Sequence, residues 1–75
     1  MSAENIFVRA ERIAQWFHAN KPSEVEPSGN PTQFDALRFA WGYLFQREKV
    51  NRNDLADGPA MRGYDYAASH PDEEV

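Results

Sequence analysis

The stretch PTQFDALRFAWGYLFQREK, residues 31–49, decides the fold because it holds the strongest helical pattern in the chain. Asn30 as N-cap, Pro31 at the first helical position and Gln33 as the reciprocal partner form a helix start signal. Apolar side chains then recur at spacings of three and four, which is typical of one face of a helix. This face comprises Phe34, Leu37, Trp41, Leu44 and Phe45, with Ala40 beside them. We expect it to pack against a second helix.

The same stretch has a second apolar strip, nearly opposite the first, formed by Ala36, Phe39 and Tyr43. A two-helix hairpin cannot cover both sides of one of its helices. Two alternatives follow: residues 55–68 fold back over this strip, or a partner covers it. For Phe39 we slightly favour the intramolecular cover.

Residues 3–20 are predicted to form the helix that packs against this stretch. Their apolar side chains recur at helical spacing, and polar side chains occupy the opposite side. We expect Ser2 to be the N-cap, and Asn20 to end the helix in a left-handed conformation before Pro22. The apolar stripe is Ile6, Phe7, Ala10, Ile13, Ala14 and Phe17.

The remaining segments carry weaker patterns. Residues 21–30 contain two prolines and a glycine and are predicted to be a loop, pinned to the core by Val25. Two alternatives are open for residues 51–68. Asn51 or Asn53 caps a short helix through Asp54, Leu55 and Ala56 that ends at the Asp57-Gly58-Pro59 turn, or Pro59 instead begins a last short helix through Met61, Tyr64 and Ala68. Residues 70–75 are expected to be a mobile acidic tail.

The predicted fold is therefore all-α. Residues 1–69 form a single domain, a helical hairpin of residues 3–20 and 31–49 closed by a short helical C-terminal segment. With 75 residues, there is room for one domain only. The two Trp, five Phe and three Tyr residues supply enough apolar surface for a small core.

The composition excludes several classes of site. Because there are no cysteines, disulfides, thiolate zinc sites and cysteine nucleophiles are ruled out, and a reducing compartment, the cytoplasm, is favoured. No stretch approaches the roughly 20 apolar residues that span a bilayer, and the N-terminus lacks a secretory signal pattern. We expect a soluble protein.

No pattern indicates catalysis. His18 and His70 are the only histidines, so a metal site would need carboxylates from distant segments. No serine lies in a strand-to-helix elbow, and the four glycines are scattered instead of forming a phosphate-binding loop. We expect no enzymatic activity, no metal and no cofactor.

A nucleic-acid interface has limited support. Residues 36–52 hold four cations against Glu48, a local charge of +3, and residues 53–69 have the loose outline of a helix-turn-helix. However, the predicted recognition helix carries only Arg62 as a cation, together with Asp65, and the whole chain has a net charge of −4. A phosphate-binding surface needs clustered Lys and Arg, so this function is the less favoured one.

The surplus of aromatic side chains points to protein binding instead. Trp, Tyr and Arg are the residue types that dominate binding energy at interfaces. We expect a non-catalytic module that inhibits or regulates a larger protein by occluding its surface; small, acidic, cysteine-free chains of this kind are frequent among phage and mobile-element inhibitors. Alanine at Phe39 and Tyr43 is expected to abolish binding and to leave the fold intact. The predicted contact residues are Trp16, Arg38, Phe39, Tyr43, Arg47 and Tyr64.

Two alternatives from other classes stay open. One is a small DNA-binding regulator that uses residues 51–69. The other is a homodimeric assembly subunit, in which the exposed apolar strip meets its own copy. Salt-dependent DNA binding would indicate the first, and twice the chain mass in solution would indicate the second.

Overall fold

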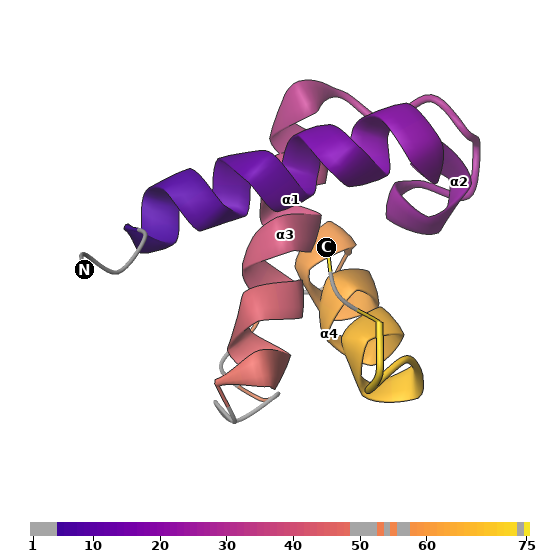
Figure 1. The fold of residues 1–75 in the computed structure, drawn as a ribbon. Helices are drawn as coiled ribbons and strands as arrows, with labels where there is room; N and C mark the ends of the chain where they lie inside the picture. The colour runs from indigo at the N-terminus through magenta and orange to yellow at the C-terminus, as the bar shows by residue number, and fades with distance from the viewer. Residues whose placement is uncertain (1–4, 49–52, 54, 56–57, 74) are drawn as a thin grey trace.

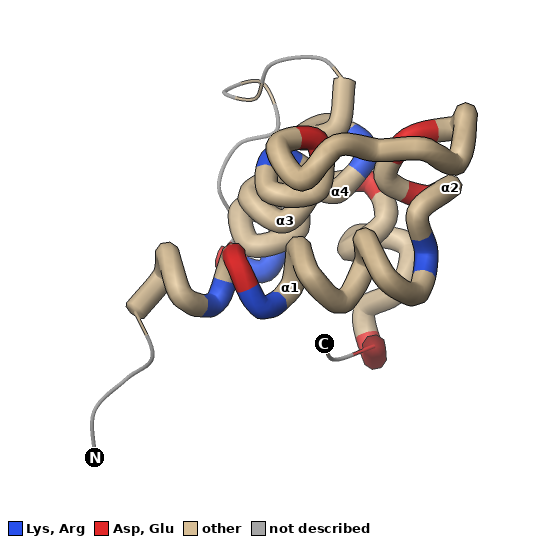
Figure 2. The backbone as a smooth tube through the Cα atoms, turned by 90° about the horizontal axis from the view of Figure 1, so that it is seen from above, with Lys and Arg blue, Asp and Glu red and all other residues tan. Residues whose placement is uncertain are grey.

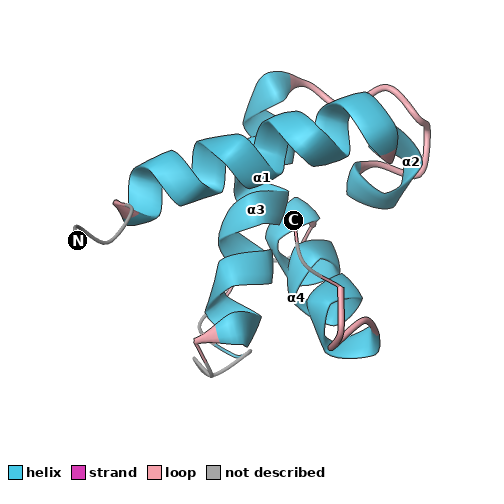
Figure 3. Cartoon of the chain, viewed as in Figure 1, coloured by secondary structure: helices cyan, strands magenta, loops and turns pink. Residues whose placement is uncertain are grey.

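The computed structural model describes residues 5–48, 53, 55, 58–73 and 75, and it confirms the all-α prediction. Its described residues form helices and loops without any strand (Figure 3). The helices, in chain order, are α1 (Ile6–Asn20), α2 (Pro22–Val25), α3 (Gln33–Arg47) and α4 (Pro59–Ser69). Helix α1 crosses α3, and α4 lies beside α3 (Figure 1). None of the described helices is both long and apolar enough to cross a membrane.

Helix α1 begins and ends differently from the prediction. Its N-cap is Asn5 and not Ser2, because the Asn5 side-chain oxygen accepts a hydrogen bond from the Phe7 amide at 2.8 Å. Asn20 is the last helical residue, and its side-chain amide donates to the Trp16 carbonyl at 2.8 Å. It therefore does not adopt the expected left-handed conformation, and Lys21 is the C-cap.

The connection between α1 and α3 is not a simple loop. Pro22 begins the single helical turn α2, where its fixed φ and missing N–H suit a first helical position. The prediction that Val25 pins this connection to the core is confirmed, since its side chain is 0% exposed. Gly29, with φ of 81°, then turns the chain toward α3.

Helix α3 begins two residues later than the prediction, at Gln33. Thr32 is the N-cap in place of Asn30, and Asp35 is its reciprocal partner in place of Gln33. The Asp35 amide donates to the Thr32 hydroxyl at 3.0 Å, and the Thr32 amide donates to the Asp35 carboxylate at 3.1 Å. This capping box satisfies two amide donors at once and places a negative charge at the positive end of the helix.

The main departure from the prediction is which face of α3 is buried. The strip of Ala36, Phe39 and Tyr43 is buried together with Ala40 and Leu44, whereas Phe34 is 62% exposed and Trp41 and Phe45 are only partly covered. The predicted core face of α3 is therefore confirmed only in part. Leu44 and Ala40 are buried, and Leu37 and Trp41 are partly buried and pack against the core, whereas Phe34 is exposed and its assignment to the core is wrong. The reason is that α4 folds back over the strip of Ala36, Phe39 and Tyr43, which is the intramolecular cover that the sequence left open as one of two alternatives.

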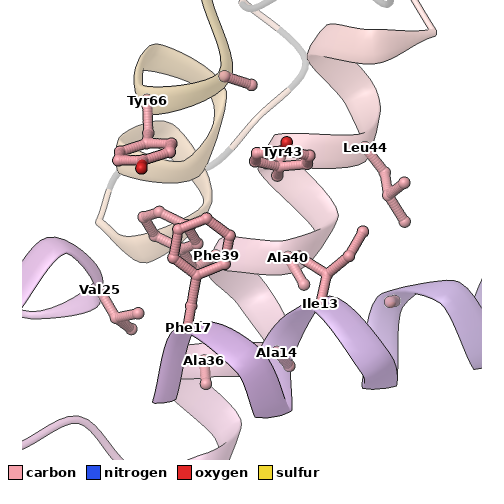
Figure 4. Packing of buried hydrophobic residues seen from close by; sticks show 12 residues of the cluster. Ile13, Ala14, Phe17, Val25, Ala36, Phe39, Ala40, Tyr43, Leu44 and Tyr66 are labelled. Atoms are coloured by element: carbon pink, nitrogen blue, oxygen red, sulfur yellow. The ribbon is translucent and has the colours of Figure 1, made fainter. Parts of the chain in front are cut away.

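Phe17 of α1 is the centre of the core. Its ring lies 4.7 Å from that of Phe39, 5.6 Å from that of Tyr43 and 5.1 Å from that of Tyr66 in α4, measured between ring centroids. Figure 4 shows these four rings gathered where α1, α3 and α4 meet, with Val25 at the edge of the group. One aromatic cluster thus joins three helices.

Two glycines let α3 and α4 approach at backbone distance. A Cβ at Gly42 would lie 1.7 Å from the Ala60 carbonyl oxygen, and a Cβ at Gly63 would lie 1.9 Å from that of Phe39. Neither distance is possible for real atoms, so any larger residue would force the helices apart. Gly63, which weakens the helical propensity of α4, is therefore required for its packing.

Described residues of the C-terminal segment contact the helices, while the mobility expected of residues 70–75 stays a prediction. Tyr66 donates its hydroxyl proton to the Glu73 carboxylate, with oxygen distances of 2.8 and 2.9 Å. Val75 packs against the core, and its backbone oxygen accepts a hydrogen bond from Arg12 at 3.0 Å. The predicted helix that begins at Pro59 is confirmed, whereas the short one over residues 53–56 falls largely outside the described residues.

Candidate functional site

Phe39 and Tyr43 are core residues, so neither can form part of a contact surface in this fold. Phe39 is 0% and Tyr43 is 3% exposed. The Tyr43 hydroxyl donates to the Glu73 carbonyl at 3.1 Å, which gives its polar atom a partner inside the protein. The prediction that these two side chains carry partner binding is corrected here: α4 and the C-terminal segment cover them.

Arg47 is also used inside the molecule. One terminal nitrogen, Nη2, donates to the Glu73 carbonyl at 2.7 Å, the His70 carbonyl at 2.9 Å and the Tyr43 hydroxyl at 2.9 Å. The other, Nη1, donates to the Ala67 carbonyl at 3.3 Å. Because these carbonyls belong to the end of α4 and the segment after it, Arg47 caps α4 from the neighbouring helix. Arg47 is thus a structural clamp whose guanidinium is engaged by the protein's own groups.

The other three predicted contact residues are at least partly exposed, but they do not lie together. Trp16 is 37% exposed and its ring packs against Phe17, on the side of α1 opposite Phe7. Tyr64 lies on α4 and is partly buried. Arg38 is partly buried on α3, with its guanidinium carbon 5.8 Å from the centre of the Phe34 ring. Of the predicted set, Arg38 alone belongs to a larger exposed apolar surface.

That surface, here called the aromatic face, runs along the side of α3 that α1 and α4 leave partly uncovered. Phe34 is exposed there, whereas Arg38, Trp41 and Phe45 are half-buried. The α3 members fall within about 60° of one another on the helix surface, at 3.6 residues per turn. Phe7 extends the face onto α1, because its ring contacts the edge of the Trp41 ring at a centroid distance of 5.5 Å. Trp41 in turn contacts Phe45 at 6.0 Å. The aromatic face comprises Phe7, Phe34, Arg38, Trp41 and Phe45.

The first turns of α1 shape one edge of this face. In both Figure 1 and Figure 2 the N-terminal part of α1 projects past α3. Phe7, 63% exposed, lies on this projecting part, and Ile6 and Val8 beside it are exposed as well. The aromatic face therefore extends beyond α3 onto the first turns of α1.

The spacing of the aromatic residues predicted their helix but not their exposure. Phe34, Trp41 and Phe45 match a core stripe by periodicity, and the sequence alone does not distinguish a core stripe from a binding stripe. A usable signal was Gly42, because a glycine in the middle of a strong helix indicates close approach of another backbone on that side. Around the helix, however, Gly42 lies about 40° from Arg38 and about 60° from both Phe39 and Phe45, so by itself it does not identify which strip α4 covers.

Tyr66 is a buried residue whose phenol has a raised pKa. Burial raises the pKa of its phenol, and the neighbouring Glu73 carboxylate raises it further, while Lys21 lowers it. The Lys21 ammonium lies 5.6 Å from the centre of the Tyr66 ring, and interaction with that phenol raises the Lys21 pKa. His70 stacks on the same ring at 4.0 Å. These contacts hold the C-terminal segment in place.

No metal site is formed by the described part of the chain, in which no three His, Cys, Asp or Glu side chains come together. A shallow groove between α1 and the start of α3 is lined by mixed polar and apolar side chains, including Glu11, Gln15 and His18. Glu11, Gln15 and His18 are exposed, and the His18 ring is already in contact with the Pro31 carbonyl at 3.1 Å. The aromatic face is therefore the stronger candidate site.

Comparison of the chain with protein-family models, with curated proteins and with solved structures finds no match to any of them.

Proposed function

We propose that this protein is a small non-catalytic binding module whose aromatic face contacts a larger protein. The observation that carries this proposal is the exposure of Phe34 and Phe7, at 62% and 63%, beside the partly covered Trp41. Large aromatic side chains clustered on a surface are typical of interaction sites. Trp and Arg in particular are enriched among the residues that dominate binding energy.

The rigid support of α3 favours this role. The helix is capped at its start by Thr32 and Asp35, packed against α1 and α4, and tied to the C-terminal segment by Arg47. A surface on such an element loses little conformational entropy on binding, so more of the contact energy contributes to affinity. Binding through one face of a small domain covers a patch on the partner, which is how an inhibitor or regulator would act. A cytoplasmic location, favoured by the cysteine-free sequence, belongs to the same proposal.

DNA binding has less support. Arg62, the cation of the predicted recognition helix, donates to the Val25 carbonyl at 2.8 Å and pairs with Glu26 at 3.4 Å. Figure 2 shows basic and acidic residues interspersed around the described chain instead of gathered on one side. A phosphate backbone requires a continuous basic surface, and α4 does not present one.

The test is affinity capture from nuclease-treated lysate of the native source, with the purified chain as bait. Phe34→Ser is the test variant, because Phe34 is the most exposed aromatic residue of α3. Trp16→Ser is the matched control, an exposed aromatic residue on the far side of α1. A protein captured by the wild type and by Trp16→Ser, and lost with Phe34→Ser, supports the proposal. The proposal is contradicted if Phe34→Ser captures the partner as well as the wild type does. It is also contradicted if only nucleic acid is recovered, and only when nuclease is omitted.

A further inference from the structure

The aromatic face has the spacing of a helix-pairing seam. Its four α3 residues, Phe34, Arg38, Trp41 and Phe45, are separated by four, three and four positions. This alternation is the a/d pattern that packs two helices side by side, with each side chain entering a hole formed by the facing helix. The four residues span about 16 Å of helix axis, at 1.5 Å per residue, which matches about three turns of a partner helix.

Arg38 is the only charged residue of this seam, and the described residues supply no carboxylate for it. The Arg38 guanidinium carbon lies 5.8 Å from the centre of the Phe34 ring. The acidic residues at the two ends of α3 are engaged elsewhere: Asp35 in the capping box and Glu48 with Arg9 at 3.7 Å. A helix laid on the seam would remove Arg38 from water. Desolvating an arginine is costly unless a carboxylate pairs with it.

This requirement argues against a second copy of the chain as the occupant. In a symmetric pair of α3 seams, every facing position is Phe, Arg, Trp or Phe, so neither Arg38 would meet a carboxylate. The net charge of −4 on each chain also disfavours self-association. A helix from a different protein can place Asp or Glu opposite Arg38 and apolar residues opposite the three rings.

We infer that the occupant of the aromatic face is an amphipathic helix of about three turns that carries a carboxylate at the seam position facing Arg38. The inference rests on the proposed function and specifies its partner. Apolar residues of that helix pack on Phe34, Trp41 and Phe45, and one end lies against Phe7. The Asp or Glu forms an ion pair with the guanidinium, which selects the partner and fixes its register.

A display library of 16-residue helices, randomised on one face, tests this without knowledge of the natural partner. Selection uses the full chain as bait, with the Phe34→Ser variant for counter-selection. Enriched peptides are expected to share apolar residues at spacings of three and four with an Asp or Glu between them. Affinity of a synthesised peptide is then measured by fluorescence anisotropy.

The decisive step is a charge exchange. Replacing the peptide carboxylate by Lys is expected to weaken binding to the wild type at least tenfold, and Arg38→Glu is expected to restore binding of that Lys peptide. Melting of the variant near the wild-type temperature shows that the fold is kept. Peptides that need Phe34 but ignore Arg38 would overturn this inference and leave the proposed function standing.

Two other outcomes are distinguishable. If counter-selection with the Phe34→Ser variant removes every binding peptide, the proposed function fails together with the inference. If sedimentation shows a dimer that Phe34→Ser dissociates, the occupant is a second copy, and the inference of an acidic partner helix is wrong.

Discussion

The Arg47 guanidinium donates a hydrogen bond of 2.7 Å to the carbonyl oxygen of Glu73, across 26 positions of sequence. This contact joins the last turn of α3 to the segment that follows α4. The same guanidinium lies 4.8 Å from the centre of the Tyr43 ring. Arg47 thus holds the C-terminal segment against α3, where that segment covers Tyr43.

Replacing Arg47 by Ala is expected to lower the free energy of unfolding by about 2 kcal/mol or more, because several carbonyls lose a charged donor. The C-terminal segment should also detach. Chemical denaturation measures the first effect, and amide hydrogen exchange in residues 70–75 measures the second. Arg38→Ala is the matched control, and its unfolding free energy should change by less than about 0.5 kcal/mol. Equal effects of the two variants would contradict the assignment of Arg47 as a clamp.

Replacement by alanine should destabilise the protein strongly at Phe39 and hardly at all at Phe34. Phe39→Ala leaves a cavity beside Phe17 and is expected to cost about 3–5 kcal/mol, enough to unfold a domain of this size. Phe34→Ala removes an exposed ring and should alter stability by no more than about 0.5 kcal/mol. Circular dichroism melting curves compare the two variants. A folded Phe39→Ala protein with wild-type melting would show that the ring is not part of the core.

Gly42→Ala should destabilise the protein although alanine is the better helix former. In an exposed helix the change would add roughly 1 kcal/mol of stability. Here the new Cβ would overlap the Ala60 carbonyl, 1.7 Å away, so α3 and α4 would have to separate. Loss of several kcal/mol, or of the folded state, is expected from overpacking at backbone contact. Gly63→Ala should act in the same direction, and a gain in melting temperature in either variant would refute the close approach.

Stability should fall in alkaline solution because of Tyr66. Burial raises the pKa of this phenol above its unfolded value of 10.0, so the folded chain keeps the proton that the unfolded chain releases. The free energy of unfolding should therefore be unaffected by this group below about pH 9 and should decline as the pH rises above 10. The slope is at most about 1.4 kcal/mol per pH unit for one proton.

Denaturation of the wild type and of Tyr66→Phe between pH 8 and pH 11 measures this dependence. The variant should show a shallower decline, since it has no phenol at that position to titrate. Interaction with the phenol also raises the Lys21 pKa, so part of the alkaline slope lost in the variant comes from Lys21. If the free energy of unfolding declines equally with pH in the two proteins, the Tyr66 phenol has the same pKa in the folded and the unfolded chain.

The local sequence was sufficient to predict where the longer helices lie along the chain. Periodicity predicted α1 and α3 to within a few residues at each end, and Pro59 marked the start of α4. Such features depend on neighbours along the chain, through spacing, proline geometry and capping. The caps were less predictable, because Asn30 and Thr32 are both good N-cap residues and the hydrogen bonds of Asp35 selected the second.

Which face of α3 is buried was decided by tertiary structure alone. The helix carries apolar side chains on two sides, and its sequence is compatible with burial of either. Gly42 and Gly63 allow α4 to pack on the side of Phe39, and Arg47 secures the segment that follows. The stripe of Phe34, Trp41 and Phe45 was thereby left at the surface. By itself the sequence determined that there would be helices with more apolar surface than two of them could bury. Backbone contact between α3 and α4 decided which part of that surface stays exposed.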